Sequence, residues 1–171
     1  MKIALFLLLS GLLTQMSTAQ LKNQITVDEK TSKRMLIGLC DRNAFHDTSF
    51  VSWFNDEYEK YAVDTSTINL IAEEIQSLKM KIVLGTWCSD SREQIPRLFK
   101  ILDHIKYPET NIHMICVDRK KKAGEYDVDD LRIELVPTII IYKDSEEIGR
   151  IIETPKMSLE EDMVDIIFSA K

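Results

Sequence analysis

Hydrophobic and polar positions along the chain follow two periods, one typical of helices and one typical of strands. Apolar and aromatic side chains recur at every third or fourth position over residues 48–61 and again over residues 88–105. Residues 80–86 are apolar almost throughout and predict a strand that is buried on both faces. The whole pattern predicts strands over residues 35–40, 80–86, 111–118, 136–144 and 147–153, and helices over residues 48–61, 64–78, 88–105, 127–131 and 158–170.

Strands that alternate with helices and then form a hairpin predict an α/β fold with a central mixed β-sheet flanked by helices. Residues 80–171 would form this domain, preceded by a leader and a helical N-terminal extension over residues 20–79. The polar residues 21–33 show no period, and we interpret them as a mobile leader. Ser158 followed by Glu161 forms a capping box at the start of the last helix, and Pro96 is expected to kink the helix that contains it.

Residues 1–19 have the pattern of a secretory signal peptide. Lys2 precedes an apolar run, and Ser17 and Ala19 are the small residues of a cleavage site. The run is too short for a stable anchor, and no second apolar run of about 18 residues follows it. We therefore expect a periplasmic or secreted protein that begins at Gln20 and has no stable membrane span after cleavage.

Charge and residue spacing narrow the classes of function. The chain has 22 basic and 28 acidic residues and a net charge of −6, so nucleic acid is a poor partner. We interpret the basic run 119–122 as a solvated loop and assign it no function. The three cysteines and three histidines lack zinc-like spacing, and the acidic residues 127–130 lack the glycine and distal glutamate of a calcium loop. We expect no metal and no cofactor.

Cys88 is the strongest candidate for chemistry. It lies in the segment LGTWCSDSREQIP, where an apolar strand is expected to lead into an amphipathic helix. The unpaired N–H groups at a helix N-terminus favour the thiolate form, which is the nucleophile. Ser91, one turn further on, can donate a hydrogen bond to that thiolate, whereas the Asp90 carboxylate opposes a second negative charge.

Several motifs in one order resemble the thioredoxin family, and in particular its exported bacterial members. Trp87 precedes the cysteine, a proline lies eight residues after it at Pro96, and Val136, Pro137 and Thr138 form a VPT motif. The likeness covers about residues 81–170. The resemblance implies that Pro137 follows a cis peptide bond and faces Cys88, and that the backbone of Val136 pairs with an extended substrate segment. Beside Cys88, Ser91 and Pro137 as catalytic positions, we assign substrate binding to Trp87, Val136 and Asp90.

The sequence departs from the family's dithiol chemistry at three positions. The second cysteine is replaced by Ser91, and an alcohol takes no part in thiol–disulfide exchange. The aspartate that family members often bury six residues before the nucleophile is Ile82 here, and the lysine that accompanies it is Met114. These differences indicate a single-cysteine (C-x-x-S) site.

Three functional hypotheses stay open at this point. In the first, Cys88 is a redox nucleophile that is resolved by an outside thiol or by another cysteine of the chain. In the second, the domain is a non-catalytic module that binds extended peptides or partner proteins. In the third, the domain is structural and Cys88 is a half-buried residue. We favour the first, a thiol–disulfide oxidoreductase with thiol- or disulfide-containing proteins or peptides as partners. Cys116 is expected to be a small core residue, and the sequence does not place Cys40. Whether either of them resolves Cys88 or pairs structurally stays open.

Overall fold

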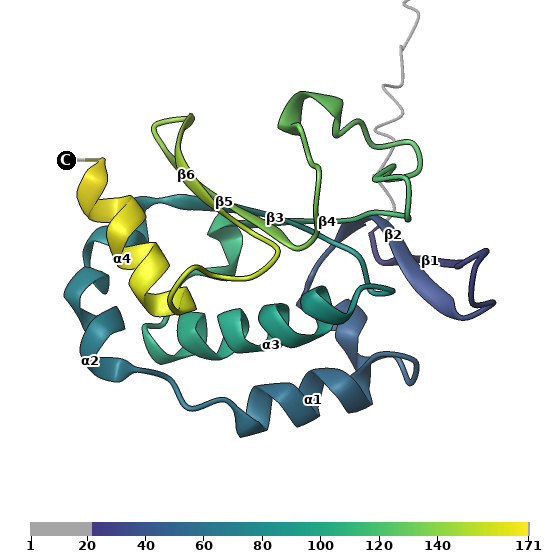
Figure 1. Cartoon of the computed structure of the whole chain (residues 1–171), viewed down its shortest axis with the longest axis horizontal. Coiled ribbons are helices and arrows are strands. Elements are labelled where there is room, and N and C mark those ends of the chain that lie inside the picture. The colour runs from purple at the N-terminus through teal and green to yellow at the C-terminus, as the bar shows by residue number, and fades with distance from the viewer. Residues whose placement is uncertain (1–21, 171) are drawn as a thin grey trace, which may run out of the picture.

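The computed structural model describes residues 22–170, and the expected signal peptide lies outside this range. Its centre is a six-stranded sheet in the order β1-β2-β4-β3-β5-β6 (Figure 1). Within this sheet β3 and β4 run parallel, and the other neighbouring strands are antiparallel. The strands are β1 (Gln24–Val27), β2 (Arg34–Cys40), β3 (Lys79–Leu84), β4 (Ile112–Cys116), β5 (Thr138–Lys143) and β6 (Glu146–Ile152). The predicted α/β fold with a central mixed sheet is confirmed.

The α-helices of the described chain cover one face of this sheet, which we call the helix-side face (Figure 1). They are α1 (Val51–Lys60), α2 (Thr65–Ile68), α3 (Ser89–His104) and α4 (Leu159–Ser169). The opposite face carries residues 117–137, which connect β4 to β5 and include a short 3-10 turn, and we call it the loop-side face.

The central strand β3 is buried on both faces, as its continuous apolar run predicted. Ile82 and Leu84 lie in the cluster beneath the helices, whereas Val83 lies in a second cluster beneath residues 117–137. All three side chains are fully buried. This central position makes the end of β3 a well-supported place from which a functional loop can begin.

Residues 22–33 overturn the expectation of an unpatterned, mobile leader. Gln24–Val27 form β1, which pairs antiparallel with β2 through a hairpin closed by a hydrogen bond from Asp28 N–H to the Lys33 carbonyl at 2.8 Å. All four residues of β1 are exposed, so backbone pairing rather than side-chain burial holds the strand in place. Because β2 pairs with β4, residues before position 80 belong to the same sheet as the residues after it, and not only to a helical extension.

The second predicted helix is broken into three pieces. After α2, the chain forms 3-10 turns at Asn69–Ile71 and Glu74–Ser77. The predicted cap is present, because the Asp64 side chain accepts hydrogen bonds from the N–H groups of Ser66 and Thr67. The four residues of α2 are threonine, serine and isoleucine, which have low helix propensity, so its side-chain cap and its packing hold it rather than propensity.

Of the other predicted helices, those at α1, α3 and α4 are present, whereas residues 127–131 form only a 3-10 turn at Asp129–Leu131. Pro96 lies inside α3 without ending it, and Ser158 caps α4 by accepting a hydrogen bond from the Glu161 N–H at 3.1 Å. In the described part of the chain, no helix combines the length and the apolar character needed to span a membrane.

Candidate thiol site

Cys88 lies at the N-terminus of α3, just beyond the carboxyl end of β3. Its N–H donates to the Gly85 carbonyl at 2.8 Å, and its extended backbone makes it the N-cap residue of the helix. The side chain is partly exposed and packs against the loop-side cluster. The unpaired N–H groups of the first turn of α3 therefore lie beside the thiol, where they favour a negative charge.

Two oxygen atoms contact the Cys88 thiol. The thiol donates a hydrogen bond to the Val136 carbonyl at 3.2 Å and lies 3.5 Å from the Asp90 carboxylate. The pairing of β3 with β5, which starts at Thr138, brings the VPT motif to this position. The Val136–Pro137 peptide bond is cis, and both residues are buried. The structure thus gathers Cys88, Asp90, Val136 and Pro137 in one place.

Ser91 corrects one sequence-based expectation. Its side chain is fully buried, and its hydroxyl oxygen accepts a hydrogen bond from the Gly85 N–H at 3.2 Å. The expected hydrogen bond from Ser91 to the Cys88 sulfur is not among those that residues 22–170 make. Ser91 instead fixes the turn between β3 and α3, so that it supports the backbone of the site rather than the thiol.

Trp87 lies against this turn and is held in one orientation. Its indole N–H donates to the Val117 carbonyl at 2.8 Å. A Cβ atom on Gly85 would lie only 2.6 Å from the Trp87 ring, so a residue without a side chain is required there. The indole therefore bridges the two parallel strand ends and forms one wall of the site.

Two cations lie over the Trp87 ring. The guanidinium carbon of Arg119 is 4.7 Å from a ring centroid, and the Lys121 amino group is 5.9 Å away. Such contacts between cations and aromatic faces are favourable, most of all with tryptophan. Both residues belong to the basic run that the sequence indicated only as a solvated loop.

Arg119 is held in place by Asp28, at the turn of the β1–β2 hairpin. Its Nε and Nη2 atoms each donate to one carboxylate oxygen at 2.8 Å, and the Asp28 side chain is only 3% exposed. Asp28 also accepts hydrogen bonds from the Thr31 hydroxyl and the Lys30 N–H. The Arg119 hydrogen bond is the main cause that holds the pKa of Asp28 well below its usual value.

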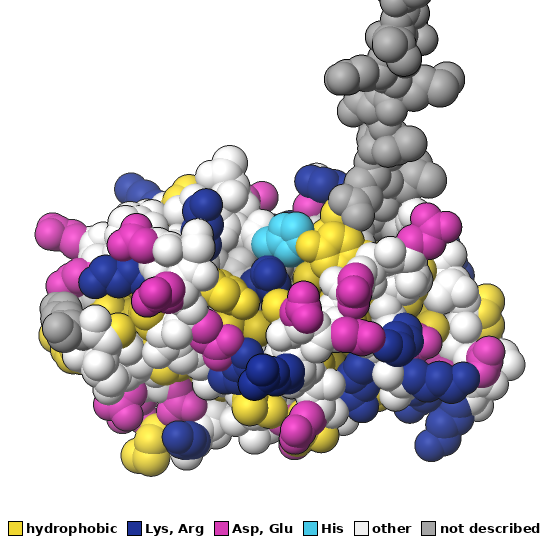
Figure 2. All heavy atoms as spheres, turned by 90° about the horizontal axis from the view of Figure 1, so that it is seen from above, with side chains coloured by type: hydrophobic (Ala, Val, Ile, Leu, Met, Phe, Trp, Pro, Cys, Tyr) yellow, Lys and Arg dark blue, Asp and Glu magenta, His cyan; other side chains and the backbone are white. Residues whose placement is uncertain are grey.

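The pKa of Arg119 is raised in turn, first by the hydrogen bond to Asp28 and to a smaller degree by the charge of Cys88. The geometry places the guanidinium on the ring of Trp87, the residue that precedes Cys88. Figure 2 looks onto the loop-side face and shows lysine and arginine side chains gathered toward the end of the molecule that carries β1 and β2. The residue before Cys88 therefore carries two cations over its ring, and the Asp90 carboxylate contacts the thiol itself.

Sequence reasoning missed the pair of Asp28 and Arg119. A signal existed, because Ile25 and Val27 alternate with polar residues before a polar turn and a second apolar run, which is a hairpin pattern. Nothing local to Arg119 indicated its contacts, since its partners lie far away in the sequence.

The other two cysteines lie in the helix-side cluster, apart from Cys88. Cys40 is opposite Met114, and Gly38 is opposite Cys116, so that the two cysteines are diagonal neighbours on β2 and β4. Both are free and buried, with exposures of 6% and 0%. Burial, followed by the nearby Cys40, raises the pKa of the Cys116 thiol well above its usual value. The expectation that Cys116 is a small core residue is confirmed, and Cys40 joins it there.

Histidine and acidic side chains do not assemble a metal site in the part of the chain that the structure describes. His104 is hydrogen bonded to Asn69, and His113 to Tyr126, rather than to a cysteine.

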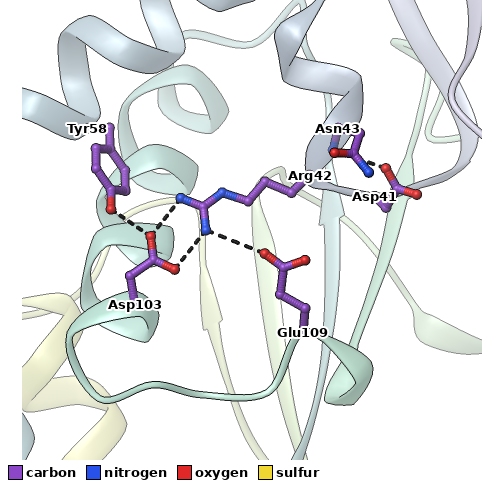
Figure 3. A network of polar contacts seen from close by, with 6 residues as sticks. All are labelled: Asp41, Arg42, Asn43, Tyr58, Asp103 and Glu109. Carbon is purple, nitrogen blue, oxygen red and sulfur yellow. Dashed lines mark hydrogen bonds and ion pairs between the residues drawn. The ribbon is translucent and has the colours of Figure 1, made fainter.

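A pocket of about 460 Å³ opens beside Cys40 and Arg42, away from the thiol. Figure 3 shows the polar network at its edge, in which Arg42 pairs with Asp103 and Glu109, and Tyr58 donates to Asp103. The network ties the 3-10 turn before α1 to α1, α3 and the segment that precedes β4. The Arg42 guanidinium is paired with two carboxylates, so we interpret the network as a structural junction.

The sheet order, with a thiol at the start of the helix after β3 and a cis-proline beside it, defines a thioredoxin-like fold. Among solved structures, the chain is similar to an HIV epitope-scaffold, with 15% identity, 76% of this chain and 83% of that chain covered, and a TM-score of 0.51. It is also similar to Fasciola hepatica thioredoxin, with 19% identity, 60% and 89% covered and a TM-score of 0.39. The corresponding values for Schistosoma mansoni thioredoxin are 24%, 63%, 92% and 0.37.

No family model and no curated protein matches the sequence. At these identities the likeness concerns the fold alone. What the site does therefore has to be argued from its own residues.

Proposed function

We propose that the protein performs thiol–disulfide exchange through Cys88 as its single nucleophilic cysteine. The observation that carries the proposal is the position of Cys88: partly exposed, at the N-terminus of α3, and in contact with the Val136 carbonyl beside the cis-proline. Partly exposed thiols at helix N-termini belong to the reactive class. The buried Ser91 takes the place where a second sulfur would lie.

The reaction has two exchange steps. The Cys88 thiolate attacks one sulfur of a partner disulfide, a new S–S bond joins the two molecules, and the partner's other sulfur leaves as a thiolate and takes up a proton. A thiol from solution then attacks the mixed disulfide and releases Cys88. The outside thiol is needed because Ser91 has no sulfur and because Cys40 and Cys116 are buried in the cluster on the other face of the sheet.

The partner is a disulfide-containing protein or peptide that presents its cysteine in an extended segment. The Val136 N–H makes no hydrogen bond within residues 22–170 and would donate to a carbonyl of that segment. With the signal peptide expected at residues 1–19, the reaction would take place in the periplasm or outside the cell.

Trapping the mixed disulfide tests this proposal. The wild type, Cys88→Ser, Ser91→Cys and a Cys40→Ser/Cys116→Ser double variant are each incubated with a disulfide-containing protein such as insulin. Adducts are separated on non-reducing gels and identified by mass spectrometry. We expect long-lived adducts with the wild type and the double variant, none with Cys88→Ser, and short-lived adducts with Ser91→Cys.

Two results would contradict the proposal. Turnover by the wild type without added thiol would show that the chain resolves its own intermediate. The absence of any adduct, combined with binding of unmodified extended peptides, would favour the alternative in which the domain is a non-catalytic binding module.

A further inference from the structure

The thiol site has a cationic side whose charges are only partly used within the protein. Arg119 donates to Asp28 through Nε and Nη2, while its Nη1 makes no hydrogen bond to any described residue. Lys121 forms no ion pair within residues 22–170 and lies over Trp87. Lys122, the next residue, differs because its amino group pairs with Asp129 at 2.7 Å. One guanidinium edge and one ammonium group are therefore available over the ring of Trp87, the residue that precedes Cys88.

These cations are positioned rather than scattered on the surface. The nearly buried Asp28 carboxylate fixes the guanidinium, and the indole supports its flat face. Trp87 is itself held by Val117 and by the absence of a side chain on Gly85. A planar guanidinium that is fixed in this way suits recognition of a carboxylate.

We propose that this cationic side recognises acidic residues next to the target cysteine, so that the preferred partner is a disulfide in an acidic extended segment. The inference rests on the proposed exchange function of Cys88 and names its substrate class. A carboxylate of the partner would contact Arg119 and Lys121 over the Trp87 ring while the partner's sulfur meets Cys88. Because the Asp90 carboxylate contacts the thiol and would repel a second carboxylate beside it, the acidic group of the partner must lie at the cations over Trp87.

The net charge of the chain would by itself disfavour acidic partners. The chain carries a net charge of −6, so its long-range field repels acidic molecules. A preference for acidic partners therefore has to come from local contacts, and not from the net charge.

Activated peptides provide the test. Three short peptides each carry one cysteine as a 2-pyridyl disulfide, flanked by Glu, Gln or Lys. Attack of the Cys88 thiolate on the peptide sulfur forms the Cys88–peptide disulfide and breaks the bond to the pyridyl sulfur, which leaves as a thiolate and takes up a proton to give pyridine-2-thione. Its absorbance gives the rate, and mass spectrometry confirms that Cys88 is the modified residue.

At low salt we expect the Glu peptide to react about fivefold faster than the Gln peptide, and the Lys peptide to react slowest. Salt should reduce the difference by screening. Lys121→Gln should remove most of the preference for Glu, measured as the ratio of the rates with the Glu and Gln peptides for the same variant. Lys122→Gln is the matched control, since it makes the same change of charge one residue away and should keep the preference.

Equal rates with the three peptides would overturn the inference while leaving the exchange function intact. An equal loss of preference in Lys121→Gln and Lys122→Gln would also overturn it, because the effect would then depend only on net charge. Failure of all three peptides to modify Cys88 would instead contradict the exchange function itself, and this inference with it.

Discussion

The two faces of the sheet each carry an arginine that stacks on an aromatic ring and pairs with an aspartate. On the helix-side face, Arg42 lies 4.9 Å from the Phe99 ring centroid and donates to Asp103 at 2.7 and 2.6 Å, with Glu109 as a second carboxylate. On the loop-side face, Arg119 lies on Trp87 and, among residues 22–170, forms an ion pair with Asp28 alone. The arginine of the helix-side face is thus paired with two carboxylates, whereas that of the loop-side face keeps one guanidinium edge free of bonds to the residues that the structure describes.

The cysteines differ between the faces in the same way. Cys40 and Cys116 lie within the helix-side cluster, whereas Cys88 lies partly exposed against the loop-side cluster. The comparison teaches that neither a cysteine nor an arginine marks a functional site by itself. What distinguishes the thiol site is that Arg119 and Trp87 are held by contacts within the protein, while, as far as residues 22–170 are concerned, the Nη1 group of Arg119 and the Cys88 thiol stay free to bind a partner.

The largest expected difference concerns alkylation. In the reduced, native protein we expect iodoacetamide to modify Cys88 at least about a thousandfold faster than Cys40 or Cys116, because buried thiols react only when the structure opens. Peptide mass spectrometry at timed intervals measures the three rates. In denaturant the rates should become similar, and a native Cys116 that reacts as fast as Cys88 would remove the contrast between the faces.

Gly85→Ala should disrupt the packing of Trp87 on the loop-side face. The new Cβ would lie 2.6 Å from the Trp87 ring, so the indole must move and give up its hydrogen bond to Val117. We expect a loss of about 1–3 kcal/mol in the free energy of unfolding, measured with denaturant. In a Trp87→Ala background the same change should cost much less, and an equal cost in both backgrounds would show that the clash is not its cause.

Arg42→Gln breaks the helix-side junction alone. It leaves Asp103 and Glu109 without their cation, and because these groups are partly exposed we expect a loss of about 1–2 kcal/mol in the free energy of unfolding. The rate of Cys88 with the acidic peptide should stay within about twofold of the wild type, since Arg42 lies on the other face. A large fall in that rate would mean that the two faces are coupled.

Asp28→Asn should have the smallest effect, and one that depends on pH. The folded pKa of Asp28 lies below its ordinary value of 3.8, so its ionised carboxylate stabilises the fold above about pH 4, and this contribution is lost as the pH falls through the lower folded value. We expect the melting temperature of the variant to lie a few degrees below that of the wild type at pH 7, and the gap to narrow below pH 4. A gap that is constant between pH 7 and pH 3 would exclude the ion pair as its origin.

The sequence predicted most of the fold because the burial of β3, β4, β5 and α3 leaves clear apolar periods. The resemblance to the thioredoxin family, and not the periodicity, implied that Val136 and Pro137 lie at Cys88, and the pairing of β3 with β5 brings Val136 there. Sequence reasoning missed β1, whose four residues are all exposed, so that backbone pairing rather than side-chain burial holds it. It missed Asp28 and Arg119 because each is an ordinary polar residue whose partner lies 91 positions away.

The position of β3 also governs how partners associate with the site. Since β3 is bonded to β4 and β5 on both sides, the turn that carries Cys88 cannot shift without disrupting two strand pairings. Residues 117–137, which form the neighbouring wall, contain only one short 3-10 turn and have far fewer constraints of this kind. We therefore expect the nucleophile to act as a fixed template, to which the partner's segment and the part of residues 117–137 beyond the anchored Arg119 adjust when a complex forms.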